Sequence, residues 1–397
     1  MTNDFDVIIV GGGVGGAALA LALGHAYPLR ILLAERRSGP GNANRGDSLL
    51  PAVTTHLAAW GALDRFKEAG ARSLSTIQMY DDAGAGLLFQ APLVPPGSPP
   101  YLVLPHPQIE RVLHDAARAT GRVEVRYRCR AERLLEENGS VRGAHIAEEE
   151  NAAREITASL VVGADGSSSA LRAALQIPFE STPYDHSFFI VDVDRPPGYE
   201  DVMRIELCAE GGILVVPQGD DRCGLGVLVH GEQEQLFRTG TIEEKLAAIG
   251  RRTRLLVGRR AFPGAHLYKV WRGHAPRYVA RGAALLGDAV HVTNPTAGQG
   301  MTMAIEDAAS LARHVGPALA AGESAPRLGE CLTAYERERH PANDGLIRWS
   351  HWMSRIYAFD SGIGSTLRRG AFGLAATPLG RFIHRKVWTR VATRGSA

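Results

Sequence analysis

The sequence predicts an α/β protein: a Rossmann-like nucleotide-binding domain interleaved with a mainly antiparallel β-sheet domain, followed by a helical C-terminus. Three observations predict this class. A β-branched strand at residues 6–10 leads into a glycine-rich turn and a helix of small residues. Two more glycine motifs follow apolar strands near residues 163 and 287. Between residues 184 and 230, short apolar strands alternate with turns, which is typical of an antiparallel sheet.

The N-terminal unit has the organisation of a dinucleotide site. Gly11 permits a tight turn, Gly13 lets the backbone approach a pyrophosphate, and Gly16 lets the following helix pack against the strand. A second apolar strand ends at Glu35, about 20 residues further on, where a carboxylate accepts hydrogen bonds from ribose hydroxyls. This unit alone does not distinguish FAD from NAD.

The two later motifs indicate FAD. The second follows the strand at residues 160–162 and reads Gly163-Ala164-Asp165-Gly166, continuing to Arg172 as D-G-x-x-S-x-x-R. The third follows the strand at residues 284–286 and reads Gly287-Asp288, then Pro295 and Gly298-Gln299-Gly300. In this order and at this separation, the three motifs predict a flavoprotein.

The spacing of these elements predicts a domain division. A nucleotide domain is expected from residues 1–75, 101–180 and 275–345, and a substrate-binding β-sheet domain from 76–100 and 181–274. Residues 346–397 are expected to form a helical C-terminal segment. A chain of 397 residues is long enough for two such cores.

Composition excludes several classes of protein. The net charge of +2 does not favour nucleic-acid binding. The four cysteines (Cys129, Cys208, Cys223 and Cys331) lack the close spacing of a metal site or a disulfide framework. No apolar run reaches the roughly 20 residues of a membrane span, and no secretion leader is recognisable, so a cytoplasmic protein is expected.

With these motifs, residues 4–345 resemble the single-component flavoprotein aromatic hydroxylases, the para-hydroxybenzoate hydroxylase-like family (group A). Within it, the ubiquinone-type and alkylquinolone-type hydroxylases are the most similar. The resemblance implies a GR2-type FAD domain, non-covalent FAD, and NADH or NADPH that docks transiently. It also implies a small aromatic substrate held between the isoalloxazine ring and the antiparallel sheet.

The resemblance also implies residue roles. Asp288 would bind the ribityl chain, Asp165 and Gly166 would lie by the pyrophosphate, and Arg172 would orient their motif. The flavin environment in which chemistry occurs would comprise Pro295, Gly298, Gln299 and Gly300, with no side-chain base assigned. The complete set of expected cofactor residues is Gly11, Gly13, Gly16, Glu35, Arg36, Arg45, His106, Arg111, Asp165, Gly166, Arg172, Gly287, Asp288, Pro295, Gly298, Gly300, Met301 and Thr302.

One of these roles has independent physical support. Residues 301–313 read as an amphipathic helix that starts directly after Gly300. A helix N-terminus carries free N–H groups and about half a positive charge, which stabilises negative charge on a reduced flavin.

Two positions depart from the family pattern. Thr302 stands where many members have asparagine, and its hydroxyl is expected to alter rather than abolish cofactor contact. His106 stands where many members have a flavin-contacting arginine, and Arg111, one turn further on, could compensate.

The substrate side is less specific in sequence. Apolar strands favour a lipophilic aromatic substrate, and proton-handling candidates are His56, His186, His230, His266 and His291. A basic amphipathic helix near residues 381–390 is expected to pack over the substrate domain rather than to contact a membrane surface.

The expected activity is hydroxylation or epoxidation through a flavin C4a-hydroperoxide, with NAD(P)H as reductant and O2 as oxidant. The alternatives are a FAD-dependent reductase or dehydrogenase of isoprenoid-type substrates, and a non-catalytic FAD-binding accessory protein. A flavin halogenase is disfavoured because the sequence lacks a W-x-W-x-I-P segment.

Overall fold

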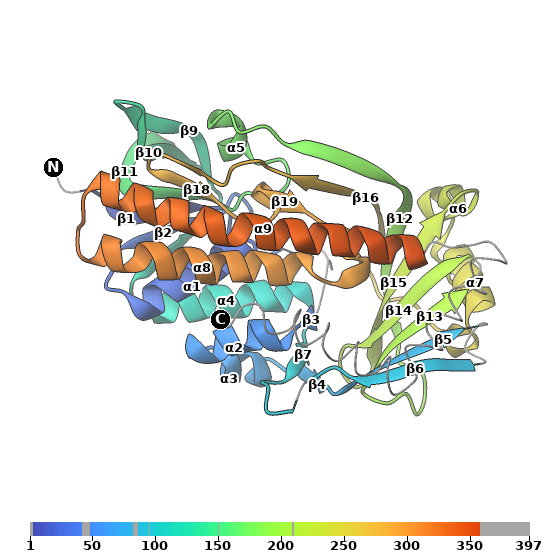
Figure 1. The fold of residues 1–397 in the computed structure, drawn as a ribbon. Coiled ribbons are helices and arrows are strands. Elements are labelled where there is room, and N and C mark those ends of the chain that lie inside the picture. The colour runs from blue at the N-terminus through green and yellow to red at the C-terminus, as the bar shows by residue number, and fades with distance from the viewer. Residues whose placement is uncertain are drawn as a thin grey trace.

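The computed structural model describes residues 3–41, 48–81, 86–94, 96–149, 151–208 and 210–357. Two large sheets stand at opposite ends of the molecule, and the long helix α9 (Ala325–Tyr357) runs from one to the other (Figure 1). Arg45 and the basic helix expected near residues 381–390 lie outside the described residues.

The first sheet is the predicted nucleotide-binding sheet. Its central path has the order β17-β18-β11-β1-β2-β8, and β9 and β10 extend it antiparallel from β11. Strands β18, β11, β1, β2 and β8 run parallel. The bounds are β1 (Phe5–Val10), β2 (Ile31–Ala34), β8 (Val123–Arg126), β9 (Cys129–Glu137), β10 (Ser140–Glu148), β11 (Asn151–Gly163), β17 (Val279–Ala280) and β18 (Ala283–Leu285).

Helix α1 (Val14–Ala26) follows the glycine turn and is apolar on all sides, as expected of a helix enclosed by other elements. It packs between α4 (His106–Ala119) and α8 (Gly300–Ala320), and α8 in turn packs on α9. Shorter helices complete this half: α2 (Pro51–Ala59), α3 (Leu63–Glu68), α5 (Ala170–Ala174), η2 (Gly287–Ala289) and η3 (Pro295–Ala297).

The second sheet has the order β19-β16-β12-β15-β14-β13-β5-β6 and is antiparallel except where β13 pairs with β5. Helices α6 (Gln233–Thr239) and α7 (Ile242–Arg252) cover one face, with η1 (Arg254–Leu256) following α7. The strands are β5 (Thr76–Asp81), β6 (Gly86–Pro92), β12 (Glu180–Asp194), β13 (Met203–Cys208), β14 (Gly211–Pro217), β15 (Arg222–His230), β16 (His266–His274) and β19 (His291–Val292).

The two halves are joined more closely than the predicted division implies. Strand β19 falls within the segment assigned to the nucleotide domain, yet it pairs with β16 of the second sheet. Helix α9 continues through the predicted boundary at residue 345. A small sheet of β3 (Ser48–Leu49), β7 (Tyr101–Val103) and β4 (Arg72–Leu74) lies between the halves (Figure 1). Among the described residues, no helix has the length and apolar character to cross a membrane.

Candidate cofactor and substrate site

The glycine turn between β1 and α1 contains two kinds of glycine. Gly11 has a φ of +107°, and a Cβ built on it would lie 2.2 Å from the Ala164 carbonyl oxygen. A Cβ on Gly16 would lie 2.0 Å from the Gly11 carbonyl oxygen, so the fold requires both glycines. Among the described residues, the atom nearest to a Cβ on Gly13 would be Glu110 Oε1, at 4.0 Å. Gly13 therefore leaves open space beside the N-terminus of α1, which is where a pyrophosphate is expected to bind.

Glu35 ends β2 and is buried beside this turn. Its carboxylate accepts hydrogen bonds from the Gly12 amide (2.8 Å), the Arg37 amide (2.8 Å) and the Arg37 guanidinium (3.0 Å). Burial opposes ionisation, but these hydrogen bonds outweigh it and hold the pKa of Glu35 below its usual value. Arg36, predicted beside it, is exposed.

One face of α4 carries two buried polar side chains, Glu110 and His114, that the sequence did not predict. Glu110 accepts a hydrogen bond from the Gly41 amide (2.6 Å) and pairs with Arg37 (3.1 Å) and His106 (3.3 Å). Burial opposes ionisation, yet His106, the Gly41 amide and Arg37 lower the pKa of Glu110 to about 2. His106 thus lies against Glu110, whereas Arg111 is exposed on the same helix.

His114 is the third member of this face. Its Nε2 lies 2.6 Å from the Gly12 carbonyl oxygen, so this nitrogen carries the proton and donates it. Its Nδ1 then accepts from the Tyr127 hydroxyl at 2.7 Å. Burial lowers the pKa of His114, consistent with a neutral ring. The spacing of four residues from His106 to Glu110 and on to His114 is a helical-face signal that could have identified them.

The second motif packs directly on the first, since the Ala164 amide donates to the Val10 carbonyl (2.7 Å). Asp165 fixes the start of α5, whose N-cap is Ser169: its carboxylate accepts from the Ser169 hydroxyl (2.5 Å) and the Ala170 amide (2.8 Å). Gly166 has a φ of +85°, and no atom of the described residues lies within 4 Å of an added Cβ. The carboxylate of Asp165 therefore shapes the loop, and Gly166 leaves it open on one side.

Arg172 connects the second motif to the third. Its guanidinium donates to the Ala289 carbonyl (2.7 Å) and the Ser167 carbonyl (2.9 Å). It also lies 4.0 Å from the centre of the Phe179 ring. Three segments that are distant in sequence are thereby joined around one side of the first sheet.

A buried polar centre holds the third motif in place, and the sequence did not predict it. Asp307 of α8 accepts hydrogen bonds from the Gly287 amide (3.1 Å), His291 Nε2 (2.6 Å), the Arg339 guanidinium (2.8 Å) and the Asn343 amide (2.9 Å). Burial opposes ionisation of Asp307, but His291 and Arg339 hold its pKa well below the usual range. Asp288, next to Gly287, is exposed.

The start of α8 lies close to this centre. Gly298 has a φ of +63° with no atom of the described residues within 4 Å of an added Cβ, and Gln299 is buried at the helix N-cap. A Cβ on Gly300 would lie 3.9 Å from Thr293. The Thr302 hydroxyl is buried and has no hydrogen-bond partner in the part of the chain that the structure describes, and Met301 beside it is half-buried.

The segment before α8 is also joined to the second sheet. The Asn294 Oδ1 atom accepts from the Thr296 amide (3.0 Å), which orients Asn294 Nδ2 as a donor to His186 Nε2 (3.0 Å). His186 is buried on β12, and burial lowers its pKa. Pro295, directly after Asn294, begins η3. Of the five histidine candidates, His186 is thus in direct contact with the residue preceding Pro295.

The other four histidine candidates do not contact the segment around Pro295 through a hydrogen bond that the structure describes. Three of them have other hydrogen-bond partners. His291 donates to Asp307, His56 Nε2 lies 3.1 Å from Glu306 Oε1, and His266 Nδ1 lies 3.1 Å from the Gly264 carbonyl oxygen. The Nε2 atom of His230, opposite His186 in the sheet, is buried and has no hydrogen-bond partner among the residues that the structure describes.

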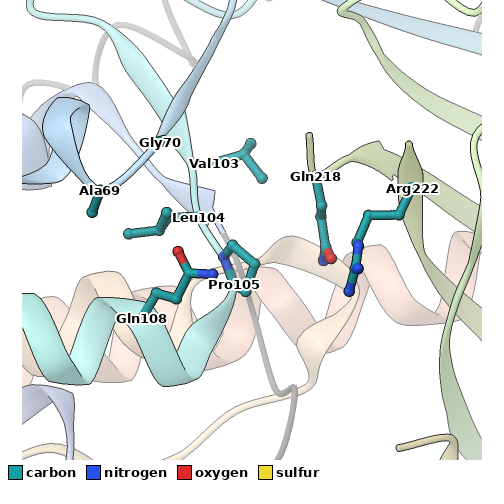
Figure 2. A pocket seen from close by; sticks show the side chains of 8 residues that line it. All are labelled: Ala69, Gly70, Val103, Leu104, Pro105, Gln108, Gln218 and Arg222. Carbon is teal, nitrogen blue, oxygen red and sulfur yellow. The ribbon is translucent and has the colours of Figure 1, made fainter. Parts of the chain in front are cut away.

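A cavity of about 280 Å³ lies between the start of α4 and the hairpin that joins β14 to β15 (Figure 2). Gln108 contributes a polar side chain from α4, and Gln218 and Arg222 contribute two from the hairpin. The remaining lining is Ala69, Gly70, Val103, Leu104 and Pro105. The cavity therefore lies between the two halves of the molecule. Its lining residue Pro105 directly precedes His106.

These features fit FAD. Gly13, Gly166 and Gly298 are open where a nucleotide backbone contact needs space, and the long helices α1 and α8 both begin there. The partnerless hydroxyl of Thr302 lies in the first turn of α8. The Thr302 hydroxyl is therefore free of protein partners among the described residues, at the position where the motifs predict the flavin.

Comparison with known proteins agrees with this reading. The model of the FAD-binding domain family matches residues 4–350. The chain is 28% identical to the human mitochondrial ubiquinone biosynthesis monooxygenase COQ6, over 94% of this chain and 89% of that protein. It is also 28% identical to 6-methylpretetramide 4-monooxygenase of Streptomyces rimosus, over 96% of this chain and 91% of that protein.

Solved structures have the same fold. PqsL of Pseudomonas aeruginosa, in complex with 2-aminobenzoylacetate, superposes with a TM-score of 0.77 at 25% identity, covering 91% of this chain and 99% of that one. Family, relatives and fold are thus consistent over nearly the whole described chain. The chain therefore belongs to the FAD-binding domain family, as an enzyme of its FAD-dependent aromatic monooxygenase type.

Proposed function

We propose that this enzyme hydroxylates or epoxidises a lipophilic aromatic substrate, with O2 as oxidant and NADH or NADPH as reductant. The observation that carries the proposal is the convergence of the three glycine motifs. Gly11 of the first motif is in contact with Ala164 of the second, and Arg172 of the second donates to Ala289 of the third (2.7 Å). These two contacts bring the three motifs together, which supports a single site for one extended dinucleotide.

In this proposal the cofactor is bound non-covalently, with the α1 turn and Glu35 serving the ADP part and Asp288 serving the ribityl chain. Exposure of the Asp288 side chain in η2 is compatible with that role. The remaining proposed contacts are Gly13, Gly16, Arg36, Arg45, His106, Arg111, Asp165, Gly166, Arg172, Gly287, Pro295, Gly298, Gly300, Met301 and Thr302.

Bound FAD supplies the redox chemistry, taking a hydride from the nicotinamide and passing electrons to O2. The chain's own contribution is electrostatic and steric. The N–H groups at the start of α8, near Gly298 and Gly300, would face the developing negative charge of the flavin pyrimidine edge. Pro295 and the buried Asn294 would limit water on the substrate side.

The aromatic class of substrate is supported by the second sheet. Phe188, Leu228 and Val270 form a buried apolar cluster with Tyr184 and Tyr268 at its edge. Apolar side chains with a few polar groups are the usual lining of a small-molecule site. The binding of 2-aminobenzoylacetate, an aromatic compound, by PqsL supports the same class.

The test is isotope incorporation by the FAD-loaded enzyme. Supplied with NADH or NADPH, 18O2 and a phenolic probe such as 1-naphthol, it is expected to form a product that carries one 18O atom, in proportion to the reductant oxidised. Unlabelled product, or product formed equally well under argon, would instead indicate a reductase or dehydrogenase. FAD released intact by acid precipitation would establish the non-covalent attachment.

A further inference from the structure

One row of residues crosses the second sheet on the face opposite α6 and α7. Direct cross-strand neighbours join β6 to β5, β5 to β13, β13 to β14, β14 to β15, and β15 to β12. The row, here called the apolar row, consists of Phe89, Met79, Ile205, Leu214, Gly226 and Ile190. It contains no charged side chain and no hydrogen-bonding side chain.

The apolar row faces the cofactor motifs. Side chains alternate along a strand, so Ile190 shares its face of β12 with His186, which contacts Asn294. Leu214 packs with the cluster that contains Val103, three residues before His106. Met353 of α9 packs on the cluster at the other end of the row. The row is therefore bordered by Asn294, by the approach to α4, and by α9.

The middle of the apolar row is less covered than the other face of the same strands. Ile213, Val215 and Val227, which point toward α6 and α7, are each 0% exposed. Ile190, Ile205, Leu214 and Gly226 are only half-buried. An apolar, half-buried strip beside the cofactor motifs is a surface that a hydrocarbon ligand can cover.

Gly226 stands in the middle of this strip, and the fold does not require a glycine there. Its φ is outside the left-handed region, and an added Cβ would make ordinary contacts with Leu214 Cβ (3.7 Å) and Ile190 Cδ1 (3.8 Å). Gly211 of β14 is different, because its φ of +113° and a Cβ position 2.8 Å from Leu228 demand glycine. A glycine inside a strand weakens the strand and often marks the close approach of a ligand.

We infer that Gly226 determines substrate specificity: the missing side chain makes room on the apolar row for the hydrocarbon body of a neutral aromatic substrate that carries an alkyl chain or a fused ring. The inference rests on the proposed function and names the substrate class of that same site. A carboxylate placed on this row would lose its hydration without gaining a partner, so anionic benzoates are disfavoured.

Binding to the FAD-loaded enzyme tests the inference without turnover. The dissociation constants of 4-hexylphenol, phenol and 4-hydroxybenzoate are measured by perturbation of the flavin absorption spectrum. The wild-type enzyme is expected to bind 4-hexylphenol most tightly. In Gly226→Leu, the ratio of the 4-hexylphenol constant to the phenol constant is expected to rise roughly tenfold, because the added side chain fills the space. Gly226→Ala is expected to produce a smaller rise.

Gly329→Leu is the matched control, since no atom in the described ranges lies within 4 Å of an added Cβ on this α9 glycine and the ratio should stay at the wild-type value. Three results would overturn the inference: tightest wild-type binding of 4-hydroxybenzoate, an unchanged ratio in a folded Gly226→Leu enzyme that retains FAD, or a gain in Gly226→Leu stability with unchanged binding. The last result would mean that protein covers the row.

Failure of the proposed function has a different signature. If Gly226→Leu shifts the binding ratio but no probe acquires 18O, the specificity inference holds and the monooxygenase proposal fails. If the wild-type enzyme labels its product and Gly226→Leu changes no ratio, the reverse holds.

Discussion

Two buried carboxylates hold the cofactor motifs, and they do so in different ways. Asp307 is 0% exposed and is enclosed by Arg339, His291 and Asn343, which are themselves buried. Glu110 is also buried, but its partner Arg37 is half-exposed and is shared with Glu35. The difference indicates that the Asp307 centre is permanent scaffold, whereas the Glu110 centre borders a surface where a ligand can compete for hydrogen bonds.

The largest effect is expected at Asp307. Asp307→Asn keeps the size of the side chain but leaves Arg339 buried without its counter-charge, which costs about 3–5 kcal/mol of unfolding free energy. Urea unfolding of the apoprotein measures it. Glu338→Gln is the control: this exposed carboxylate pairs with Arg313 (2.7 Å), and its loss should cost less than about 1 kcal/mol. Equal losses for the two variants would mean that burial does not distinguish the pairs.

Glu110→Gln is expected to have an intermediate effect. The carboxamide oxygen can still accept from the Gly41 amide, but the ion pair with Arg37 and the carboxylate that faces His106 are lost. Arg37 keeps Glu35 as a partner, so the expected loss is about 1–2 kcal/mol. The same urea titration measures it. A loss as large as that of Asp307→Asn would show that Glu110 too is rigid scaffold and would remove the distinction between the centres.

The distinction also explains how much of the site the sequence could predict. The family, FAD and the α/β class are confirmed, because a short motif records local packing such as that of Gly16 against Gly11. The two carboxylate centres were missed, since Glu110 contacts Gly41 and Asp307 contacts Arg339 across long sequence separations. Strand alternation predicted the second sheet, but only the register aligns Gly226 with Ile190 and Leu214.

The continuation of α9 shows a similar limit. Pro341 lies inside this helix, where proline ordinarily ends or kinks it, yet the helix runs from Ala325 to Tyr357. Tyr335 donates to the Leu285 carbonyl (2.9 Å), and Arg339 binds Asp307, on the N-terminal side of the proline. Ser350, on its other side, donates to the Asn294 carbonyl (2.6 Å). Tertiary contacts on both sides of Pro341 therefore outweigh the local preference.

The two centres are expected to lose their contributions to folding stability at different pH values. The Asp307 centre extends through Asn343 and Tyr278 to His274, whose pKa burial and the neighbouring His340 lower from 6.5 to about 4. The unfolded chain binds this proton below about pH 6.5 and the folded chain only near pH 4, so stability falls as pH decreases between these values. The shift from 6.5 to about 4 corresponds to about 3 kcal/mol of stability.

Glu110 contributes in a lower window, because its pKa is lowered from 4.5 to about 2 and its stabilisation is lost only as pH falls through that range. Unfolding free energies measured from pH 7 to pH 4 test the window in which His274 contributes. Steps of about 0.5 pH unit resolve a transition of this width. In His274→Asn that slope should become shallower, with the remainder coming from other buried histidines whose pKa burial lowers, such as His114 and His186. In Glu110→Gln the slope should persist, and an unchanged slope in His274→Asn would assign this pH window to the other histidines.

The smallest effect on stability, and the most specific one on the cofactor, is expected at Gly13. Its added Cβ would approach no atom closer than Glu110 Oε1 (4.0 Å), so Gly13→Ala should change the unfolding free energy of the apoprotein by less than about 1 kcal/mol. The same methyl group would occupy the space proposed for the pyrophosphate, and the FAD dissociation constant should rise about tenfold or more.

Gly11→Ala is the contrasting variant, because its Cβ would overlap the Ala164 carbonyl and unfold the turn itself. Flavin fluorescence titration and urea unfolding together separate the two glycines. If Gly13→Ala binds FAD normally, the open space beside Glu110 is not where the cofactor lies.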